Sequence, residues 1–387
     1  MKNFPFVQLS GFYFFYFALL GALVPYWALY LQSFGFEAQT IGLLMACLHV
    51  TRIIAPNLWG WIADKTGQRL RIVRVGAFIT CCIFAAIFWQ KDALGIGLVI
   101  LGFSFFWNAV LPQFEVITLT HLGADSDRYS RIRLWGSIGF IVAVLALGWL
   151  LDWVGVQWLP VVMLGIMIMI WLNALIVPNA APKQNERSSG EGFLRLLLRP
   201  QVIAFFVICF LVQFSHGAYY TFYSVLMESV GFSRGEIGIL WAIGVIAEVV
   251  IFIYMHRLIQ RYGLRLIMIV SLVLCVLRWL VIGVWPDVLP VMLVAQTLHA
   301  ATFGALHAVG IALVHHYFSE NTHGQGQALF SSLGFGAGGA AGAVVSGLMW
   351  ESTGSVATFV VSSAAAMIAV VLAFVWIRPE KVQQNAQ

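Results

Sequence analysis

The chain has 387 residues, of which 61% are hydrophobic and only 10% are charged, and its formal net charge is +5. A soluble domain carries about 25% charged residues, so this composition argues against a soluble protein and favours a helical membrane protein. The apolar runs are continuous and about 20 residues long, which excludes the alternating pattern of a transmembrane β-barrel.

Apolar runs bounded by charged residues, Gly and Pro predict twelve membrane-spanning helices. In chain order they are 6–31, 40–62, 72–89, 93–119, 132–152, 157–177, 201–227, 236–259, 265–284, 288–317, 325–348 and 354–377. The first run is too long for the apolar core of a signal peptide, and no A-x-A cleavage site follows it. We therefore expect it to stay in the protein as a transmembrane helix.

The longest polar stretch, PNAAPKQNERSSGEGFLRLLLRP at 178–200, separates the sixth run from the seventh. It is rich in Pro, Ser, Gly and charged residues, which is typical of a linker. We therefore predict a six-helix bundle at 1–178, a cytoplasmic linker at 179–200 and a second six-helix bundle at 201–387. Two helical halves on either side of a linker are common in secondary transporters, which place the substrate site near the midplane between them.

The distribution of lysine and arginine predicts the orientation in the membrane. With the N-terminus inside, the cytoplasmic segments hold 17 of the 21 basic residues, while Arg52 and Arg278 lie within spans and Lys91 and Arg234 lie outside. This bias predicts a multi-pass protein of the inner (plasma) membrane with both termini in the cytoplasm. It also accounts for the positive net charge, so no nucleic acid partner is expected.

The loop between the second and third runs reads GWIADKTGQRLR, with Gly60, Asp64, Gly67, Arg69 and Arg71 at fixed spacing. This segment resembles the signature G-x-x-x-D-[RK]-x-G-x-[RK]-x-[RK] of the major facilitator superfamily. The resemblance implies the major facilitator fold and a gating role for these five residues. The Asp64 carboxylate is suited to pair with an arginine or to cap a neighbouring helix, which would lock the inward gate. The corresponding loop of the second half, MHRLIQRYGLRL, lacks the acidic residue.

Few ionisable residues lie deep inside the predicted spans. Arg52 does so in the second span, and Glu248, Arg278 and His299 do so in the eighth, ninth and tenth, while Glu115 in the fourth and Arg133 at the start of the fifth lie nearer the cytoplasm. Charges within a bilayer are paired, neutralised or hydrated, and by default they indicate function. We predict that Glu248 and Arg278 pair, either as a static bond between two spans or as a pair that responds to substrate. In the second case an anion on the arginine would free the carboxylate to take up a proton.

Polar-tipped rings recur at helical spacing in the seventh span, at His216, Tyr219, Tyr220 and Tyr223. Such a stripe indicates either ordinary packing or a cavity for a ring-bearing substrate. His299 is likewise either a satisfied core residue or a proton carrier, since histidine titrates near neutral pH. His307, two turns further along, lies nearer the cytoplasmic end.

Several longer stretches resemble one branch of the superfamily, the 3-phenylpropionic acid permease family, which is related to lactose permease. These stretches are RLWGSIGF (133–140), AYYTFYS (218–224), LWAIGVIAEVVIF (240–252), VLRWLVIG (276–283) and LHAATF (298–303). Similarity to lactose permease implies that Glu115 and Arg133 bind substrate and that Glu248, Arg278 and His299 form a charged network. This chain has Thr302 where that permease carries its proton on a glutamate, so another group would have to carry the proton.

We therefore predict a monomeric, proton-coupled symporter that works by alternating access, with an aromatic carboxylate as the best candidate substrate. A sugar or nucleoside importer is the alternative, and an exporter of amphiphiles is less favoured. The predicted substrate-binding residues are Arg52, Glu115, Arg133, His216, Tyr219, Tyr220, Tyr223 and Arg278, and the predicted proton-coupling residues are Glu248, His299 and Glu115. The sequence contains no nucleophile–base pair, phosphate loop or cysteine pattern with metal-ligand spacing, so no enzymatic activity, cofactor or metal is expected.

Overall fold

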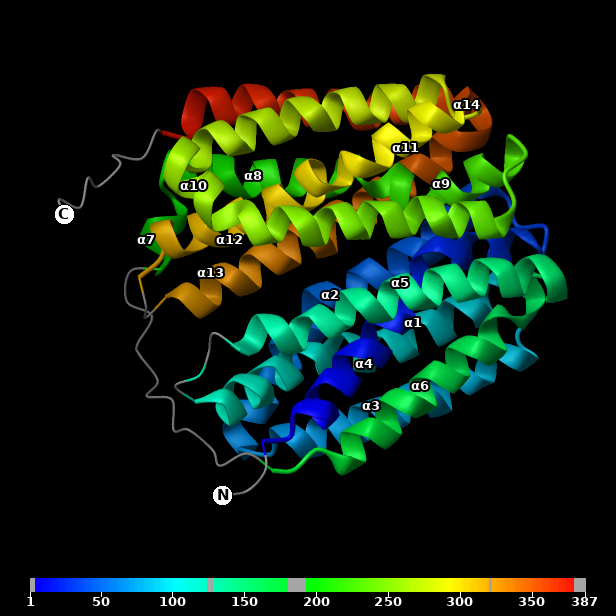
Figure 1. The fold of residues 1–387 in the computed structure, drawn as a ribbon, viewed down its shortest axis with the longest axis horizontal. Coiled ribbons are helices and arrows are strands. Elements are labelled where there is room, and N and C mark those ends of the chain that lie inside the picture. Colours follow the sequence, from blue (N-terminus) through cyan, green and yellow to red (C-terminus); the bar gives the residue numbers. More distant parts are fainter. Residues whose placement is uncertain (1–3, 124, 126–127, 180–192, 320–321, 379–387) are drawn as a thin grey trace. The chain divides into compact units, whose positions relative to one another are not determined.

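The computed structural model describes residues 4–123, 125, 128–179, 193–319 and 322–378, and in these residues every regular element is a helix (Figure 1). Ten helical stretches in this part of the chain are long and apolar enough to cross a membrane. The all-helical membrane class predicted from composition is therefore confirmed. Most of the predicted linker at 179–200 lies outside the described residues.

The first six candidate spans lie close to their predicted positions. They are α1 (Phe6–Gln32), α2 (Ala38–Thr66), α3 (Arg69–Ala85) with the 3₁₀ turn η1 (Ala86–Trp89), α4 (Ala93–Leu122), α5 (Tyr129–Val154), and α6 (Leu159–Ile176) preceded by η3 (Val156–Trp158). The 27 residues of α1 extend over roughly 40 Å at 1.5 Å per residue, which is enough to cross a bilayer.

The second part of the chain has helices of more varied length. They are α7 (Phe193–Leu197), α8 (Pro200–Ser215), α9 (Gly217–Ser229), α10 (Arg234–Val284), α11 (Leu289–Thr297), the π-helical η4 (Ala300–Ala305), α12 (Leu306–Tyr317), α13 (His323–Phe330), the π-helical η5 (Ser331–Gly338) and α14 (Gly339–Trp376).

Two of these helices are longer than a bilayer requires, and each is interrupted by one glycine. Gly263 within α10 has φ 73°, and Gly354 within α14 has φ 83°, which are backbone angles that residues with side chains rarely adopt. The interruptions stand at or beside the places where the sequence predicts a turn between two spans. The total of twelve spans stays a prediction.

The chain forms two compact units. Unit 1 comprises Met1–Glu186 and Tyr220–Ala242, and unit 2 comprises Arg187–Tyr219 and Ile243–Gln387. The boundaries predicted for the two six-helix bundles, at 178 and 200, stay a prediction. Fully buried residues that form the core of unit 1 include Leu19, Phe103, Val144 and Met163, and those of unit 2 include Phe205, Leu272, Val309 and Ala369.

Glycines allow one helix pair in each unit to pack backbone against backbone. In unit 1, α5 packs on α1, with Gly139 facing the Phe14 carbonyl group of α1. In unit 2, Gly338 and Gly342 face the carbonyl groups of Phe210 and Phe214 on α8. Small residues four positions apart are the usual means of close helix approach in membranes, where hydrophobic burial between helices gives little driving force.

Arginine side chains cap the end of a helix in both units. The last carbonyl groups of a helix have no partner within it. Arg74 of α3 donates to three of them at the end of α6, at 2.9–3.0 Å, and Arg265 of α10 donates to the Phe374 carbonyl oxygen of α14 at 2.7 Å. A positive charge at a helix C-terminus also complements the helix dipole.

The start of α10 is capped from another helix of unit 1. The Asp152 carboxylate of α5 accepts hydrogen bonds from the backbone N–H groups of Arg234 and Gly235, each at 2.8 Å. The Arg234 side chain donates to the Leu151 carbonyl oxygen at 2.9 Å. These bonds hold the first turn of α10 at the end of α5.

The close packing of α1 and α5 gives a stability prediction. A Cβ atom at Gly139 would overlap the backbone of Phe14, whereas one at Gly165 of α6 has nothing within 4 Å. Both substitutions gain the same helix propensity, so Gly165→Ala is a matched control for Gly139→Ala. We expect Gly139→Ala to lower the free energy of unfolding by about 1–3 kcal/mol through overpacking. Equal thermal unfolding midpoints of the two variants in detergent would show that the packing of α5 on α1 does not depend on the absence of a side chain at Gly139.

Candidate functional site

A fully buried arginine organises the polar interior of unit 2. Arg278 of α10 is 0% exposed. Its Nε donates to the Ala295 carbonyl oxygen at 2.9 Å, its Nη1 donates to Thr302 Oγ1 at 2.9 Å and to His299 Nδ1 at 3.1 Å, and its Nη2 donates to Gln296 Oε1 at 3.3 Å. Arginine has five N–H donors, so these bonds use all but one of them.

Aromatic rings cover the faces of the same guanidinium group. The Cζ atom of Arg278 lies 4.4 Å from the ring centroid of Tyr219 and 4.9 Å from that of Trp279. The Tyr219 hydroxyl group donates to Gln296 Oε1 at 2.8 Å, so that one amide oxygen accepts from both the tyrosine and the arginine. Ring faces attract cations most strongly when the charge is removed from water.

His299 connects this arginine to the carboxylate of Glu248. Its Nε2 atom lies 3.5 Å from Glu248 Oε2, while its Nδ1 faces Arg278. His299 belongs to a third helix segment, directly before η4, and offers one ring nitrogen to each partner. The direct pair of Glu248 and Arg278 stays a prediction.

The hydrogen bonds assign the tautomer of His299. A guanidinium group can only donate, so Nδ1 of His299 must accept, and the proton of the neutral ring is on Nε2, facing Glu248. While Arg278 donates to Nδ1, the ring has no free nitrogen for a second proton. Among Arg278, His299 and Glu248, the group that can still take a proton is therefore the Glu248 carboxylate.

A second polar cluster, in unit 1, surrounds Glu115 of α4. The Tyr129 hydroxyl group donates to Glu115 Oε1 at 3.4 Å, and the ring of Tyr13 stands edge-on to that of Tyr129 at 6.3 Å. Arg133 and Arg52 lie within electrostatic range of the Glu115 carboxylate. The structure therefore brings together three predicted substrate-binding residues, Glu115, Arg133 and Arg52.

Arg133 is held by stacking rather than by hydrogen bonds. Its Cζ atom lies 3.9 Å from the ring centroid of Phe17 and 5.8 Å from that of Tyr13, and the side chain is partly exposed. In the described part of the chain no acceptor is assigned to its N–H groups. The stacked face is covered by rings, while the edge with the donors stays available.

The four residues of the predicted aromatic stripe do not act as one surface. Tyr219 belongs to the Arg278 network, and His216, at the break between α8 and α9, bonds through Nδ1 with the Val212 carbonyl oxygen at 2.8 Å. Tyr220 and Tyr223 contact the ring of Trp241 in unit 1, at 6.3 and 5.7 Å between centroids. His216 and Tyr219 both contact the ring of Trp279, at 4.8 and 5.6 Å between centroids, so the stripe divides within α9, between Tyr219 and Tyr220.

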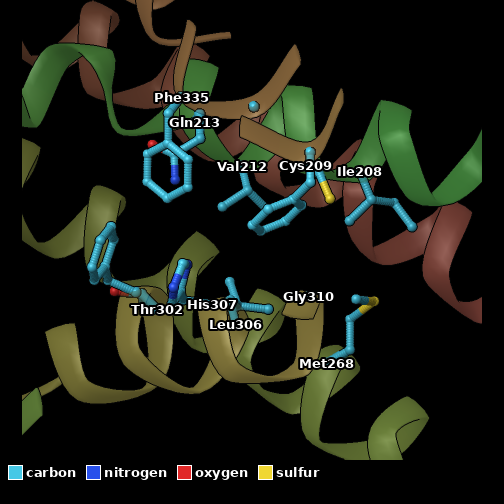
Figure 2. A pocket seen from close by; sticks show the side chains of 13 residues that line it. Ile208, Cys209, Val212, Gln213, Met268, Thr302, Leu306, His307, Gly310 and Phe335 are labelled. Carbon is cyan, nitrogen blue, oxygen red and sulfur yellow. The ribbon is translucent and has the colours of Figure 1, made fainter. Parts of the chain in front are cut away.

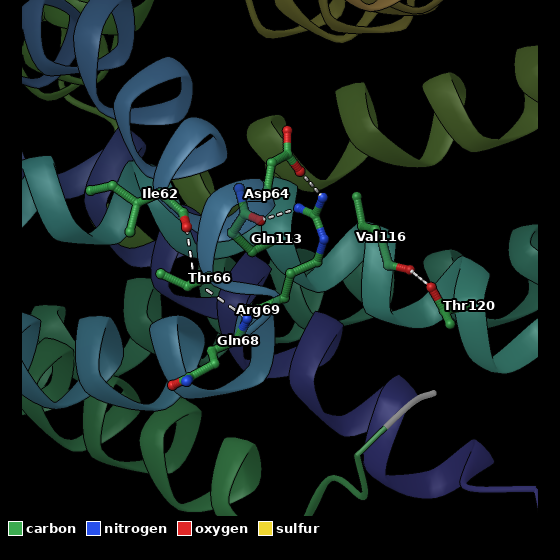
Figure 3. A network of polar contacts seen from close by, with 8 residues as sticks. All are labelled: Ile62, Asp64, Thr66, Gln68, Arg69, Gln113, Val116 and Thr120. Atoms are coloured by element: carbon green, nitrogen blue, oxygen red, sulfur yellow. Dashed lines mark hydrogen bonds and ion pairs between the residues drawn. The ribbon is translucent and has the colours of Figure 1, made fainter. Parts of the chain in front are cut away.

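The signature loop forms a small network that fixes α2, α3 and α4 to one another (Figure 3). Arg69 makes an ion pair with Asp64 and donates to Gln113 Oε1 of α4 at 2.5 Å. Gly67 ends α2 in the left-handed conformation, with φ 66°, and Arg71 donates to Gln68 Oε1 at 3.0 Å. The structure thus contains the Asp64–arginine pair, and its gating role stays a prediction.

Sequence reasoning missed two residues of these clusters. Gln296 is fully buried and accepts from Tyr219 and Arg278, although no role was predicted for it from the sequence. Tyr129 stands at the start of α5, in a polar stretch where a tyrosine gives no signal. A buried amide in an apolar run is the sign that could have indicated Gln296, since buried polar groups are paired.

The shared acceptor of Gln296 gives a prediction about stability. In Gln296→Leu the donors of Tyr219 and Arg278 both lose their acceptor, and each orphaned donor costs about 1–3 kcal/mol. In the background of Tyr219→Phe one of these donors is already absent, so the same substitution should cost less. A double-mutant cycle on thermal unfolding measures this coupling, and strictly additive effects would contradict the shared bond.

Comparisons with known proteins agree with this architecture. The model of the MFS_1 like family matches residues 6–361. A probable 3-phenylpropionic acid transporter of Escherichia coli (strain K12) is 29% identical over 307 residues, covering 78% of this chain and 80% of that protein. The maltose permease of Geobacillus stearothermophilus is 27% identical over 360 residues, covering 88% and 86%. The crystal structure of the nucleoside transporter NupG superposes with a TM-score of 0.84 at 19% identity, covering 98% of this chain and 100% of that one.

Proposed function

Because this chain belongs to the MFS_1 like family of membrane transporters and is not an enzyme, we propose that it moves a small aromatic carboxylate across the plasma membrane together with protons. The observation that carries the proposal is the presence of two unlike arginines. Arg133 has N–H donors available beside aromatic rings. Arg278 donates to His299, which in turn faces the Glu248 carboxylate. The first suits an anionic substrate, and the second suits proton coupling.

Arg133 is the best partner for the substrate carboxylate. A planar guanidinium edge matches a carboxylate with two parallel hydrogen bonds. Phe17 and Tyr13 already lie against Arg133, so an aryl ring attached to the carboxylate finds ring neighbours there. Arg278 suits this role less, because binding an anion would require it to give up bonds to His299, Thr302 or Gln296. The name of the E. coli relative supports the same class of substrate.

Glu248 is the proposed carrier of the coupled proton. The tautomer of His299 leaves no nitrogen free while Arg278 donates to it, so an arriving proton goes to the carboxylate. A protonated Glu248 is neutral, which removes the cost of a charge within the bilayer during the transport step. If Arg278 moves away from Nδ1, the ring becomes able to share the proton, and this links the state of the arginine to that of the carboxylate.

A substitution of Glu248 tests the coupling. Glu248→Gln imitates the protonated side chain permanently, so we expect exchange of labelled 3-phenylpropionate across proteoliposome membranes to continue. Accumulation against a gradient should fall at least ten-fold, because the proton cannot leave. Glu37→Gln makes the same change at an exposed residue and should keep both activities. Normal accumulation by Glu248→Gln would remove Glu248 from the mechanism and leave Glu115 and His299 as candidates.

Arg133 gives a separate prediction about the substrate. Arg133→Lys keeps the charge but loses the planar fork, and we expect the dissociation constant for 3-phenylpropionate to rise about ten-fold or more. The measurement is the ligand-induced shift in thermal unfolding, since a ligand stabilises the state that binds it. Arg128→Lys, at an exposed arginine paired with Asp125, is the matched control. Unchanged affinity in Arg133→Lys would exclude this arginine as the carboxylate partner.

A neutral sugar or nucleoside is the second candidate substrate. The pair of Glu115 and Tyr129 favours it, because a carboxylate and a phenol both bind hydroxyl groups. The maltose permease and the nucleoside transporter are relatives of this kind. The same unfolding assay with maltose, uridine and 3-phenylpropionate distinguishes the two classes of substrate.

The remaining elements of the proposal concern the transport cycle. Twelve spans with both termini in the cytoplasm form two bundles that alternate access to the substrate, and the protein acts as a monomer. Asp64, Arg69 and Gln113 hold the cytoplasmic ends of α2, α3 and α4 together, which supports a role in the inward gate. At the end of α5 that is predicted to face outside, the Asp152 carboxylate accepts hydrogen bonds from the first turn of α10.

A further inference from the structure

We infer that a small pocket in unit 2 is filled with water and carries protons between His307 and the Arg278–His299–Glu248 chain, with His307 as the relay at its exposed end. This inference rests on the proposed proton coupling. The pocket lies between α8 on one side and η4 and α12 on the other, and η5 closes it (Figure 2).

The pocket connects a solvent-accessible residue with a buried one. Thr302 lines it and is 0% exposed, and its hydroxyl oxygen accepts a hydrogen bond from Arg278 at 2.9 Å. His307 lines the same pocket and is partly exposed. A water beside Thr302 would therefore lie two hydrogen bonds from the guanidinium that holds His299.

The size of the pocket selects water as its occupant. Its free space is about 30 Å³. A cavity needs about 10–15 Å³ to hold one water, whereas a cavity that binds benzene measures about 150 Å³. The pocket therefore has room for about two or three waters and none for the aryl ring of a substrate.

Polar groups in the walls supply the bonds that such waters need. Gln213 of α8 is 8% exposed, and in the described part of the chain its amide has no hydrogen-bond partner. Figure 2 shows Gln213 and His307 on opposite sides of the pocket. Buried amides are nearly always bonded to protein or to ordered water, so Gln213 favours water here. Thr302 and His307 provide two more partners.

The rings along the pocket explain why water is required. The rings of His299, Phe303 and His307 stand nearly parallel, with centroids 5.1 and 6.1 Å apart. Phe303 separates the two histidines, so no proton can pass directly between them. The pocket runs beside Phe303 and offers a way around it. Two π-helical segments, η4 and η5, form the walls, and such segments often occur at functional sites.

The relay step keeps the protonation of His307 unchanged. The ring takes a proton from a solvent water at one nitrogen and releases the proton of its other nitrogen to a pocket water. The pocket waters pass one proton onward past Thr302, and the Glu248 carboxylate takes it, because His299 has no free nitrogen while Arg278 donates to it. Only O–H and N–H bonds are made and broken, and no other reactant takes part.

The first test detects the water without any substrate. X-ray radiolysis converts bound water to hydroxyl radicals that oxidise the nearest side chains, and Met268 lines the pocket although it is only 2% exposed. Met163, which is 0% exposed in unit 1, is the internal reference. We expect Met268 in the purified full-length protein to be oxidised several-fold faster than Met163. Equal rates would overturn the hydrated pocket.

A glycine of η5 provides a variant that fills the pocket. A Cβ atom at Gly334 would meet Cys209 and Gln213 only at 3.6–3.8 Å, which is ordinary contact. Gly334→Ala should therefore fold, displace water and lower the oxidation of Met268 to the rate of Met163. Gly165→Ala adds the same methyl group where nothing lies within 4 Å and should leave both rates unchanged. Unaltered oxidation of Met268 in Gly334→Ala would contradict the assignment of water to this pocket.

The second test measures the relay. In proteoliposomes, His307→Gln should reduce accumulation of 3-phenylpropionate at least ten-fold and leave exchange within two-fold of the original protein, because exchange needs no net proton movement. Accumulation at the original rate, or equal loss of both activities, would overturn the relay. If the unaltered protein neither accumulates nor exchanges 3-phenylpropionate, the proposed function is wrong and the relay falls with it, whereas the oxidation of Met268 decides the water pocket independently.

Discussion

The buried positive charge of Arg278 is the constraint on which the interior of unit 2 depends. A guanidinium group surrounded by apolar helices has to be bonded on its edge and covered on its faces, because an unsatisfied charge in such a place is expensive. The backbone of Ala295 and the side chains of Gln296, His299 and Thr302 meet the first demand, and the rings of Tyr219 and Trp279 meet the second. Because Arg278 donates to Nδ1 of His299, the neutral ring carries its proton on Nε2, which faces the Glu248 carboxylate.

The same residue type has opposite roles in the two units because its surroundings differ. Arg278 donates to protein groups with almost all of its N–H donors, so it organises the polar interior of unit 2. Arg133 is stacked on Phe17 and keeps its edge available, so it is suited to bind something from outside. In the proposed transport cycle Arg278 keeps its partners, and Arg133 exchanges them as the substrate binds and leaves.

Backbone contacts between helices position the Glu115 cluster of unit 1 and one wall of the pocket in unit 2. Gly139 lets α5 approach the backbone of α1, which carries Tyr13 and Phe17, and α5 itself carries Tyr129 and Arg133. In unit 2, Gly338 and Gly342 bring η5 and α14 against α8, so that Gln213 faces the pocket beside η5. The Glu115 cluster and one wall of the pocket in unit 2 therefore each lie on a glycine-packed helix pair, where a change in packing alters them directly.

The sequence by itself determined the membrane class, the approximate position of each candidate span and the residues worth attention, because apolar run length and isolated intramembrane charges are local properties of the chain. It named Glu248, Arg278, His299, Glu115 and Arg133, and all five lie in the two clusters. Only the tertiary structure decided how they are connected. It placed His299 in contact with both Glu248 and Arg278, used Gln296 as a shared acceptor and divided the aromatic stripe between the rings of Trp279 and Trp241. Helical periodicity fixes which residues share a face of one helix, but hydrogen bonds between helices depend on rotation, on π-helical segments and on glycine contacts, which arise only when the helices pack together.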